Sequence, residues 1–119
     1  MDLVNNIINV RKNLDGKEVD YNEIIKCDDI YIEKRNDKII CIINYTVEVD
    51  GGDNEYWGDE SFEIERLLTD EEILKIGCVT QYDYDTGIKK YTYHDINVHW
   101  SEADKIRTKE IDEYNYVIV

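Results

Sequence analysis

The sequence predicts a single α+β domain over residues 1–119, with a mainly antiparallel sheet of five to six strands, an N-terminal helix and one or two short helices. The first segment places apolar residues at helical spacing, and most later segments alternate apolar and polar residues as strands do. No internal repeat or Pro- and Gly-rich linker divides the chain, and its hydrophobic content of 42% is too high for a disordered acidic tail. One domain with one core is therefore expected.

The opening segment predicts an amphipathic helix of about three turns. Asp2 lies in its first turn, where the helix dipole favours a negative charge, and the pattern ends near Asp15-Gly16. The apolar residues at helical spacing are Leu3, Val4, Ile7, Ile8 and Leu14. Residues 20–26 then either add a helical turn or lead directly into the sheet.

The pattern changes to strand from Asp29, with a turn at Asn36-Asp37 and a long strand over residues 38–49. The uninterrupted apolar run over residues 39–43 indicates a central strand that is covered on both faces. The second half of this strand alternates, which predicts an inward set and an outward set. Tyr45, Val47 and Val49 are expected inward, and Glu48 and Asp50 outward.

Residues 50–59 are predicted to form a loop, followed by a strand in which Phe62 and Ile64 alternate with Glu63 and Glu65. Thr69-x-x-Glu72 is a capping box, so a short helix is expected to begin there, and Gly77 is expected to end it.

A hairpin is predicted over residues 79–98, with its turn at Asp85-Thr86-Gly87. Residues 82–88 resemble a single unit of the YD (Rhs) repeat family, whose pattern is Y-x-Y-D-x-x-G, although Gly87 stands one place early and no second copy exists. The same residues also describe a tyrosine-bearing hairpin. Ser101 followed by Asp104 predicts a further helix to about Glu110, and residues 114–119 predict a last strand. The order of helix and then meander is compatible with a cystatin-like arrangement.

Almost all of the formal net charge of −14 lies in one quarter of the chain. Residues 44–72, the acidic window, contain eleven acidic residues against the single base Arg66, whereas residues 1–43 and 73–119 are each only −2. Such concentrated acidity favours a surface that meets a cationic partner. It also disfavours direct binding to nucleic acid or to an anionic membrane, because both would repel it.

Residues two apart on a strand share a face at roughly 6.6 Å. Glu48 with Asp50, and Glu63 with Glu65, are therefore predicted to form two facing rows of carboxylates, at a spacing that resembles the phosphates of a nucleic-acid strand. Tyr56-Trp57, flanked by glycines, is typical of an interface anchor when exposed. The alternatives are a solvated acidic face and a Trp57 that folds back onto the sheet. The candidate partner-binding residues are Glu48, Asp50, Asp53, Glu55, Tyr56, Trp57, Asp59, Glu60, Glu63 and Glu65.

No catalytic, metal or cofactor motif accompanies this surface. The loop at residues 50–60 holds oxygen donors for Ca²⁺ but lacks the EF-hand order. His94 and His99, five apart on an expected strand, point to opposite faces and cannot share a metal unaided. Neither G-x-S-x-G nor a Gly-rich phosphate loop is present. The sequence is interpreted as non-enzymatic, a small enzyme using carboxylates and His94 being the remaining alternative.

The charge pattern favours an acidic inhibitor that occupies the basic nucleic-acid-binding site of a target protein such as a defence nuclease or toxin, as anti-restriction and anti-CRISPR DNA mimics do. The alternatives are an immunity protein that neutralises a nuclease toxin, and an accessory or scaffold domain with a solvating acidic face. A cytoplasmic location is expected, because no signal peptide or membrane span is recognisable and the three cysteines have no paired spacing. These are Cys27, Cys41 and Cys78.

Overall fold

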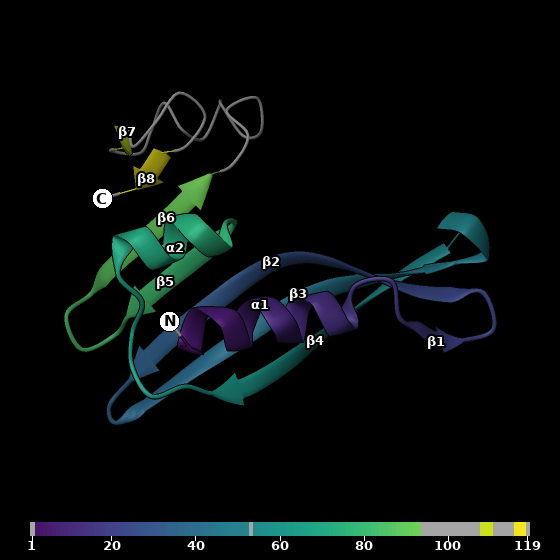
Figure 1. Cartoon of the computed structure of the whole chain (residues 1–119), viewed down its shortest axis with the longest axis horizontal. Coiled ribbons are helices and arrows are strands. Elements are labelled where there is room, and N and C mark those ends of the chain that lie inside the picture. Colours follow the sequence, from purple (N-terminus) through teal and green to yellow (C-terminus); the bar gives the residue numbers. More distant parts are fainter. Residues whose placement is uncertain (1, 53, 94–107, 111–115, 119) are drawn as a thin grey trace.

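A computed structural model describes residues 2–52, 54–93, 108–110 and 116–118, and the predicted α+β class is confirmed (Figure 1). Within these residues, two helices and a short 3₁₀ turn accompany eight strands. The elements are α1 (Asp2–Leu14), β1 (Glu18–Asp20), β2 (Glu23–Arg35), β3 (Lys38–Val49), the turn η1 (Asp50–Gly52), β4 (Asn54–Glu63), α2 (Asp70–Ile76), β5 (Val79–Asp83), β6 (Ile88–Tyr93), β7 (Thr108–Glu110) and β8 (Tyr116–Ile118).

The strands form one mixed sheet in the order β4-β3-β2-β5-β6-β8-β7, with β1 paired to β2. Among the described pairings, that of β2 with β5 is parallel and the rest are antiparallel. The strand count exceeds the predicted five to six because residues 18–20 and 108–110 add two short strands. Residues 20–26 therefore lead into the sheet instead of adding a helical turn. Thr108–Glu110 pairs with β8 and does not end a helix as predicted.

Both helices lie on the same face of the sheet, and α1 lies across β2, β3 and β4 (Figure 1). The predicted first helix is confirmed as α1, with Asp2 in its first turn. Its apolar side chains pack against the strands on the face of the sheet that the helices cover. The buried cluster consists of Leu3, Val4, Ile7, Ile30, Ile32, Cys41, Ile43, Ile64, Leu68, Ile73, Ile76 and Val79. Burial raises the pKa of the Cys41 thiol to about 12, which keeps the thiol protonated in this core.

The prediction that residues 39–43 are covered on both faces is wrong. Cys41 and Ile43 are fully buried beneath the helices, whereas Ile40 and Ile42, on the opposite face, are only half-buried. The reason is that both described helices pack on the same side, so the apolar run marks a central strand without a second covering layer. This opposite side of β2, β3 and β4 is called the open face below.

Two polar clamps fix the segment between β4 and β5. The predicted capping box is confirmed, since the Thr69 hydroxyl accepts from the Glu72 amide and the Glu72 carboxylate accepts from the Thr69 amide. Arg66 also donates to both Glu72 oxygens at 2.7 and 2.9 Å. These bonds, the Arg66 bond foremost, lower the Glu72 pKa to about 2. The buried Gln81 amide donates to the Leu68 carbonyl and accepts from the Leu68 amide.

The segment that resembles a YD repeat unit forms the β5–β6 hairpin, with Gly87 at a positive φ of 71°. Its polar and aromatic groups have local structural partners. The Tyr82 and Tyr84 rings meet edge to face at 4.3 Å, Arg35 lies over the Tyr84 ring, and Asp85 accepts from the Asn36 amide. The continuation of the predicted strand to residue 98, both histidines and the predicted helix start at Ser101 lie outside the described residues. No described helix has the length and apolar character needed to cross a membrane.

Candidate functional site

The part of the acidic window that follows β3 forms a tight turn and a long strand instead of the predicted loop. β3 ends at Val49, the turn η1 reverses the chain with positive φ at Asp50, Gly51 and Gly52, and β4 begins at Asn54. The predicted loop over residues 50–59 is therefore wrong for residues 54–59. They belong to a strand over residues 54–63 that pairs in continuous register with β3, from Val49 opposite Asn54 to Ile40 opposite Glu63. The pairing partner, which the local sequence does not reveal, outweighs the low strand propensity of Asn, Asp and Gly.

Tyr56 and Trp57 lie on opposite faces of β4, because successive strand residues alternate. Trp57 stands opposite Thr46 on the open face, and it is 82% exposed. Tyr56 stands opposite the buried Val47 on the helix side, where its hydroxyl donates to the Glu23 carboxylate at 3.2 Å. Desolvation and this hydrogen bond raise the Tyr56 pKa. The two aromatic residues therefore do not act as one anchor, and Trp57 is the exposed one.

The carboxylates do not form the two facing rows that the sequence predicts. Glu48 lies on the open face opposite Glu55, whereas Glu63 lies on the same face but opposite Ile40, at the far end of the ladder. Asp50 belongs to the turn η1, and Glu65 follows the end of β4. The open-face carboxylates of β4 are Glu55, Asp59 and Glu63, which are four residues or roughly 13 Å apart. The expected phosphate-like repeat along one strand is thus absent.

The acids of β4 differ from most other described acids of the window in having no partner among the residues that the structure describes. Glu72 binds Arg66, Asp70 binds Lys90 at 2.9 Å, and Glu48 lies 3.8 Å from Lys26. The remaining described residues give no hydrogen bond or ion pair to the β4 carboxylates, namely Glu55, Asp59, Glu60 and Glu63. Like charges without a counterion contribute nothing to the strand and oppose its pairing. Asp53 lies outside the described residues.

Two acids that the sequence analysis missed extend this surface to β2. The register between β2 and β3 shifts between Cys27 and Ile30, and the extra residue forms a bulge. Asp28 accepts from the Thr46 hydroxyl at 2.7 Å and Asp29 from the Asn44 amide at 3.1 Å. Since Thr46 stands opposite Trp57, β3 alone separates these β2 carboxylates from the strand that carries the exposed indole. The consecutive acids Asp28 and Asp29 inside an otherwise apolar strand are the sequence signal that could have indicated this bulge.

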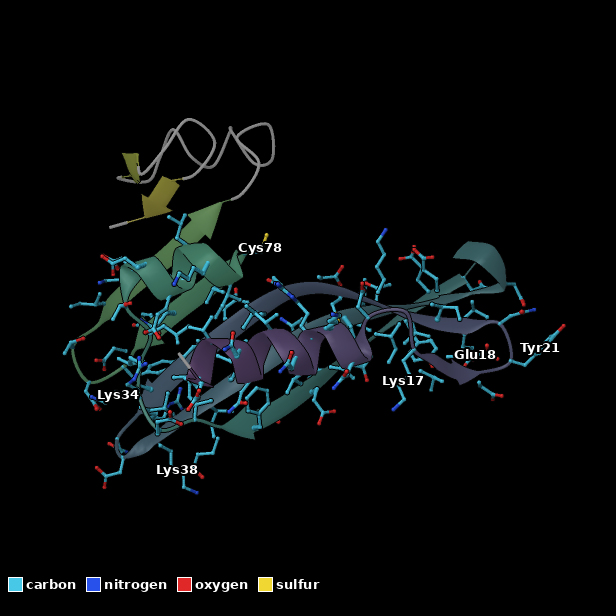
Figure 2. The ribbon with its side chains drawn as sticks, in the orientation of Figure 1. Lys17, Glu18, Tyr21, Lys34, Lys38 and Cys78 are labelled. Atoms are coloured by element: carbon cyan, nitrogen blue, oxygen red, sulfur yellow. The ribbon has the colours of Figure 1, made fainter. Side chains whose placement is uncertain are left out.

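The sheet extends beyond α1 as an arm made of β1, the start of β2, the end of β3, η1 and the start of β4 (Figure 1). Figure 2 shows Lys17, Glu18 and Tyr21 at this end of the molecule and Lys34 and Lys38 at the opposite end. Of the seven exposed large apolar side chains among the described residues, the arm carries five, namely Val19, Tyr21, Ile24, Tyr56 and Trp57. Val19, Tyr21 and Ile24 were not predicted, because their exposure depends on how far the arm projects past the helix. Exposed aromatic residues among acids are typical of protein interfaces.

A cleft of about 540 Å³ separates the last turn of α1 from the end of α2. Cys27 and Cys78 both line it, together with Arg11, which donates to the Ile76 carbonyl at 3.1 Å. Burial, followed by the nearby Asp15 carboxylate, raises the pKa of Cys27. A thiol with a raised pKa is a poorer nucleophile at neutral pH, so Cys27 gives no support to thiol chemistry in this cleft.

The described residues contain no group of three or more His, Cys, Asp or Glu side chains arranged to hold a metal ion. What they do present is an exposed indole with the unpaired carboxylates of Glu55 and Asp59 two residues to either side of it on the same face of β4, which can bind a cationic and partly apolar surface. Comparison of the chain with protein-family models, with curated proteins and with solved structures found no match.

Proposed function

We propose that this protein is a non-enzymatic inhibitor whose arm and β4 bind a basic, nucleic-acid-binding surface of a target protein. The observation that carries the proposal is Trp57, exposed in the middle of a strand whose four carboxylates have no partner among the described residues. A strand that served only the fold would gain nothing from such carboxylates, whereas a basic partner would neutralise them on binding.

Charge and anchor have different roles in this proposal. The net charge of −10 in the acidic window steers a basic target towards the arm and raises the rate of association. Trp57, and Tyr21 at the end of the arm, supply apolar area that becomes buried and slows dissociation. The proposal needs no metal and no covalent step.

The test is capture of targets from the source organism with three forms of the protein. The first is wild type, and the second is Glu55→Gln/Asp59→Asn/Glu63→Gln. The third removes three charges outside the arm and β4, with the changes Asp2→Asn, Asp37→Asn and Glu71→Gln. Wild type and the third form should retain the same basic protein, and the β4 variant should lose it.

Nucleic acid added to the captured complex should release the target, as should about 0.5 M salt, because both compete for the same basic surface. Equal retention by the β4 variant and by the control, or a complex that nucleic acid leaves intact, would contradict the proposal. An immunity protein would use the same surface, and a toxin nuclease as the captured target would identify that role.

Free nucleic acid should not bind this protein, since every phosphate would be repelled by a net charge of −14. Fluorescence anisotropy with labelled single-stranded and duplex DNA, at physiological salt and without added metal, measures this. Submicromolar binding would argue for a nucleic-acid-binding protein in place of an inhibitor of one.

A further inference from the structure

The outer edge of β4 is an unpaired strand edge in the described part of the sheet. β4 ends the strand order, and β3 pairs with its other side along the full length without a register shift. An exposed edge of this length offers a row of free amides and carbonyls to another strand. β4 also contains no Lys and no Pro, two residues with which proteins commonly block such edges.

The hydrogen-bond pattern identifies which backbone groups are free. The Ile64 amide donates to the Ile39 carbonyl at 2.9 Å, so this opposed pair is a hydrogen-bonded one. Hydrogen-bonded and non-hydrogen-bonded pairs alternate along an antiparallel ladder. The even residues of β4 therefore bond to β3, and the odd residues direct their amides and carbonyls to the outer edge. These are Glu55, Trp57, Asp59, Ser61 and Glu63, whose side chains are also the ones on the open face.

We propose that an extended basic segment of the target adds to this edge as a further strand. The inference rests on the proposed function and specifies its binding mode. The edge of β4 is protected against pairing with other strands by negative charge, which disfavours acidic strands and favours basic ones. A second copy of β4, with four acids and no base, would set like charges against each other. A strand with Arg or Lys would instead place them beside the unpaired carboxylates.

The spacing of the carboxylates defines the segment that fits. Glu55, Asp59 and Glu63 recur every fourth residue on the open face, with Trp57 and Ser61 between them. Residues opposed on neighbouring strands have Cβ atoms about 5 Å apart. The complementary strand therefore carries basic residues at every fourth position, with an apolar residue or Arg beside Trp57. Backbone bonds to the odd residues provide affinity, and this spacing provides specificity.

The test uses two synthetic nine-residue peptides of Arg, Val and Thr with identical composition. One has Arg at the first, fifth and ninth positions, and the other has its three Arg side by side. Fluorescence anisotropy should give a dissociation constant at least tenfold lower for the spaced peptide. Equal affinity would mean attraction by net charge alone and would overturn strand addition, as would absence of binding or dimerisation of the protein in place of peptide binding.

Ser61→Pro removes one outward amide without changing any charge, and edge strands tolerate proline at such positions. It should weaken binding of the spaced peptide at least tenfold, whereas Ser61→Ala, which keeps the amide, should stay within twofold of wild type. In wild type, the bound peptide should slow hydrogen exchange at the Trp57, Asp59 and Ser61 amides at least tenfold. This second measurement does not depend on the folding of the proline variant. Unchanged exchange at those amides would overturn the proposal.

The captured target separates the two proposals. If the Glu55→Gln/Asp59→Asn/Glu63→Gln variant loses the target while Ser61→Pro retains it, the acidic surface binds the target but not by strand addition. If both variants retain it, the proposed function itself fails. Loss of the target by both, with retention by Ser61→Ala, supports both proposals.

Discussion

Truncation of Trp57 should separate binding from folding. Trp57 is 82% exposed, so folding of the monomer removes only about 45 Å² of the roughly 250 Å² of its side chain from water. At about 25 cal/mol per Å² this contributes close to 1 kcal/mol. Trp57→Ala should therefore lower the free energy of unfolding by ~1 kcal/mol or less. Burial of the remaining area of roughly 200 Å² in a complex could contribute up to ~5 kcal/mol to the free energy of binding. Truncation of an interface anchor commonly costs about 2 kcal/mol or more of that energy.

The expected result is at least a tenfold rise in Kd for the captured target, mainly through faster dissociation. Surface plasmon resonance measures this, and urea unfolding measures the stability of the monomer. Ile88→Ala is the matched control, because Ile88 is also exposed but lies outside the arm. In a Trp100→Phe background, which leaves one indole, Trp57 fluorescence should be red-shifted in the free protein and shift to the blue on binding. A loss of several kcal/mol in the monomer, with blue-shifted emission, would refute the reasoning.

Three further substitutions test the fold. Glu72→Gln should lower the free energy of unfolding at pH 7 by about 1–2 kcal/mol, a value reduced to allow for solvent screening. Because folding depresses the Glu72 pKa to about 2, this difference in urea unfolding should disappear as the pH falls from about 4.5 to 2. Gly58→Ala would place a Cβ 2.6 Å from the Tyr45 ring, so a loss of about 1–3 kcal/mol is expected in thermal unfolding, and an unchanged melting temperature would contradict this. Gln81→Met leaves the Leu68 amide and carbonyl unpaired in the core, so calorimetry should show a fall of about 2–3 kcal/mol in the free energy of unfolding. A neutral result would mean that Gln81 is not a structural clamp.

Features set by neighbouring residues in the chain could be predicted from the sequence. The first helix follows from apolar spacing, and the second from a capping box whose two bonds join Thr69 to Glu72, three residues away. The β5–β6 turn follows from Asp85-Thr86-Gly87, because glycine there adopts a positive φ.

Features set by distant partners could not be predicted. Residues 54–59 look like a loop by composition and become a strand because β3 lies beside them. β1 and β7 are three residues long and exist only as partners of β2 and β8. The exposure of Trp57 and the half-burial of Ile40 both depend on which side of the sheet the helices cover. No pattern within a single strand carries that information.

The parallel pairing of β2 with β5 has a consequence for the order of folding. The β2–β3–β4 meander forms through short turns, whereas the β2–β5 pairing joins Ile30 to Val79, which lies about 49 residues further along the chain. Contacts of such separation form late because closing the intervening segment costs entropy. We expect an early intermediate in which the far edge of β2, with its apolar Ile32, is uncovered and prone to aggregation. The acidic residues of β3 and β4 already belong to that intermediate, and we expect their charge to oppose association of partly folded chains, an effect on solubility that adds nothing to the pairing of the folded strand.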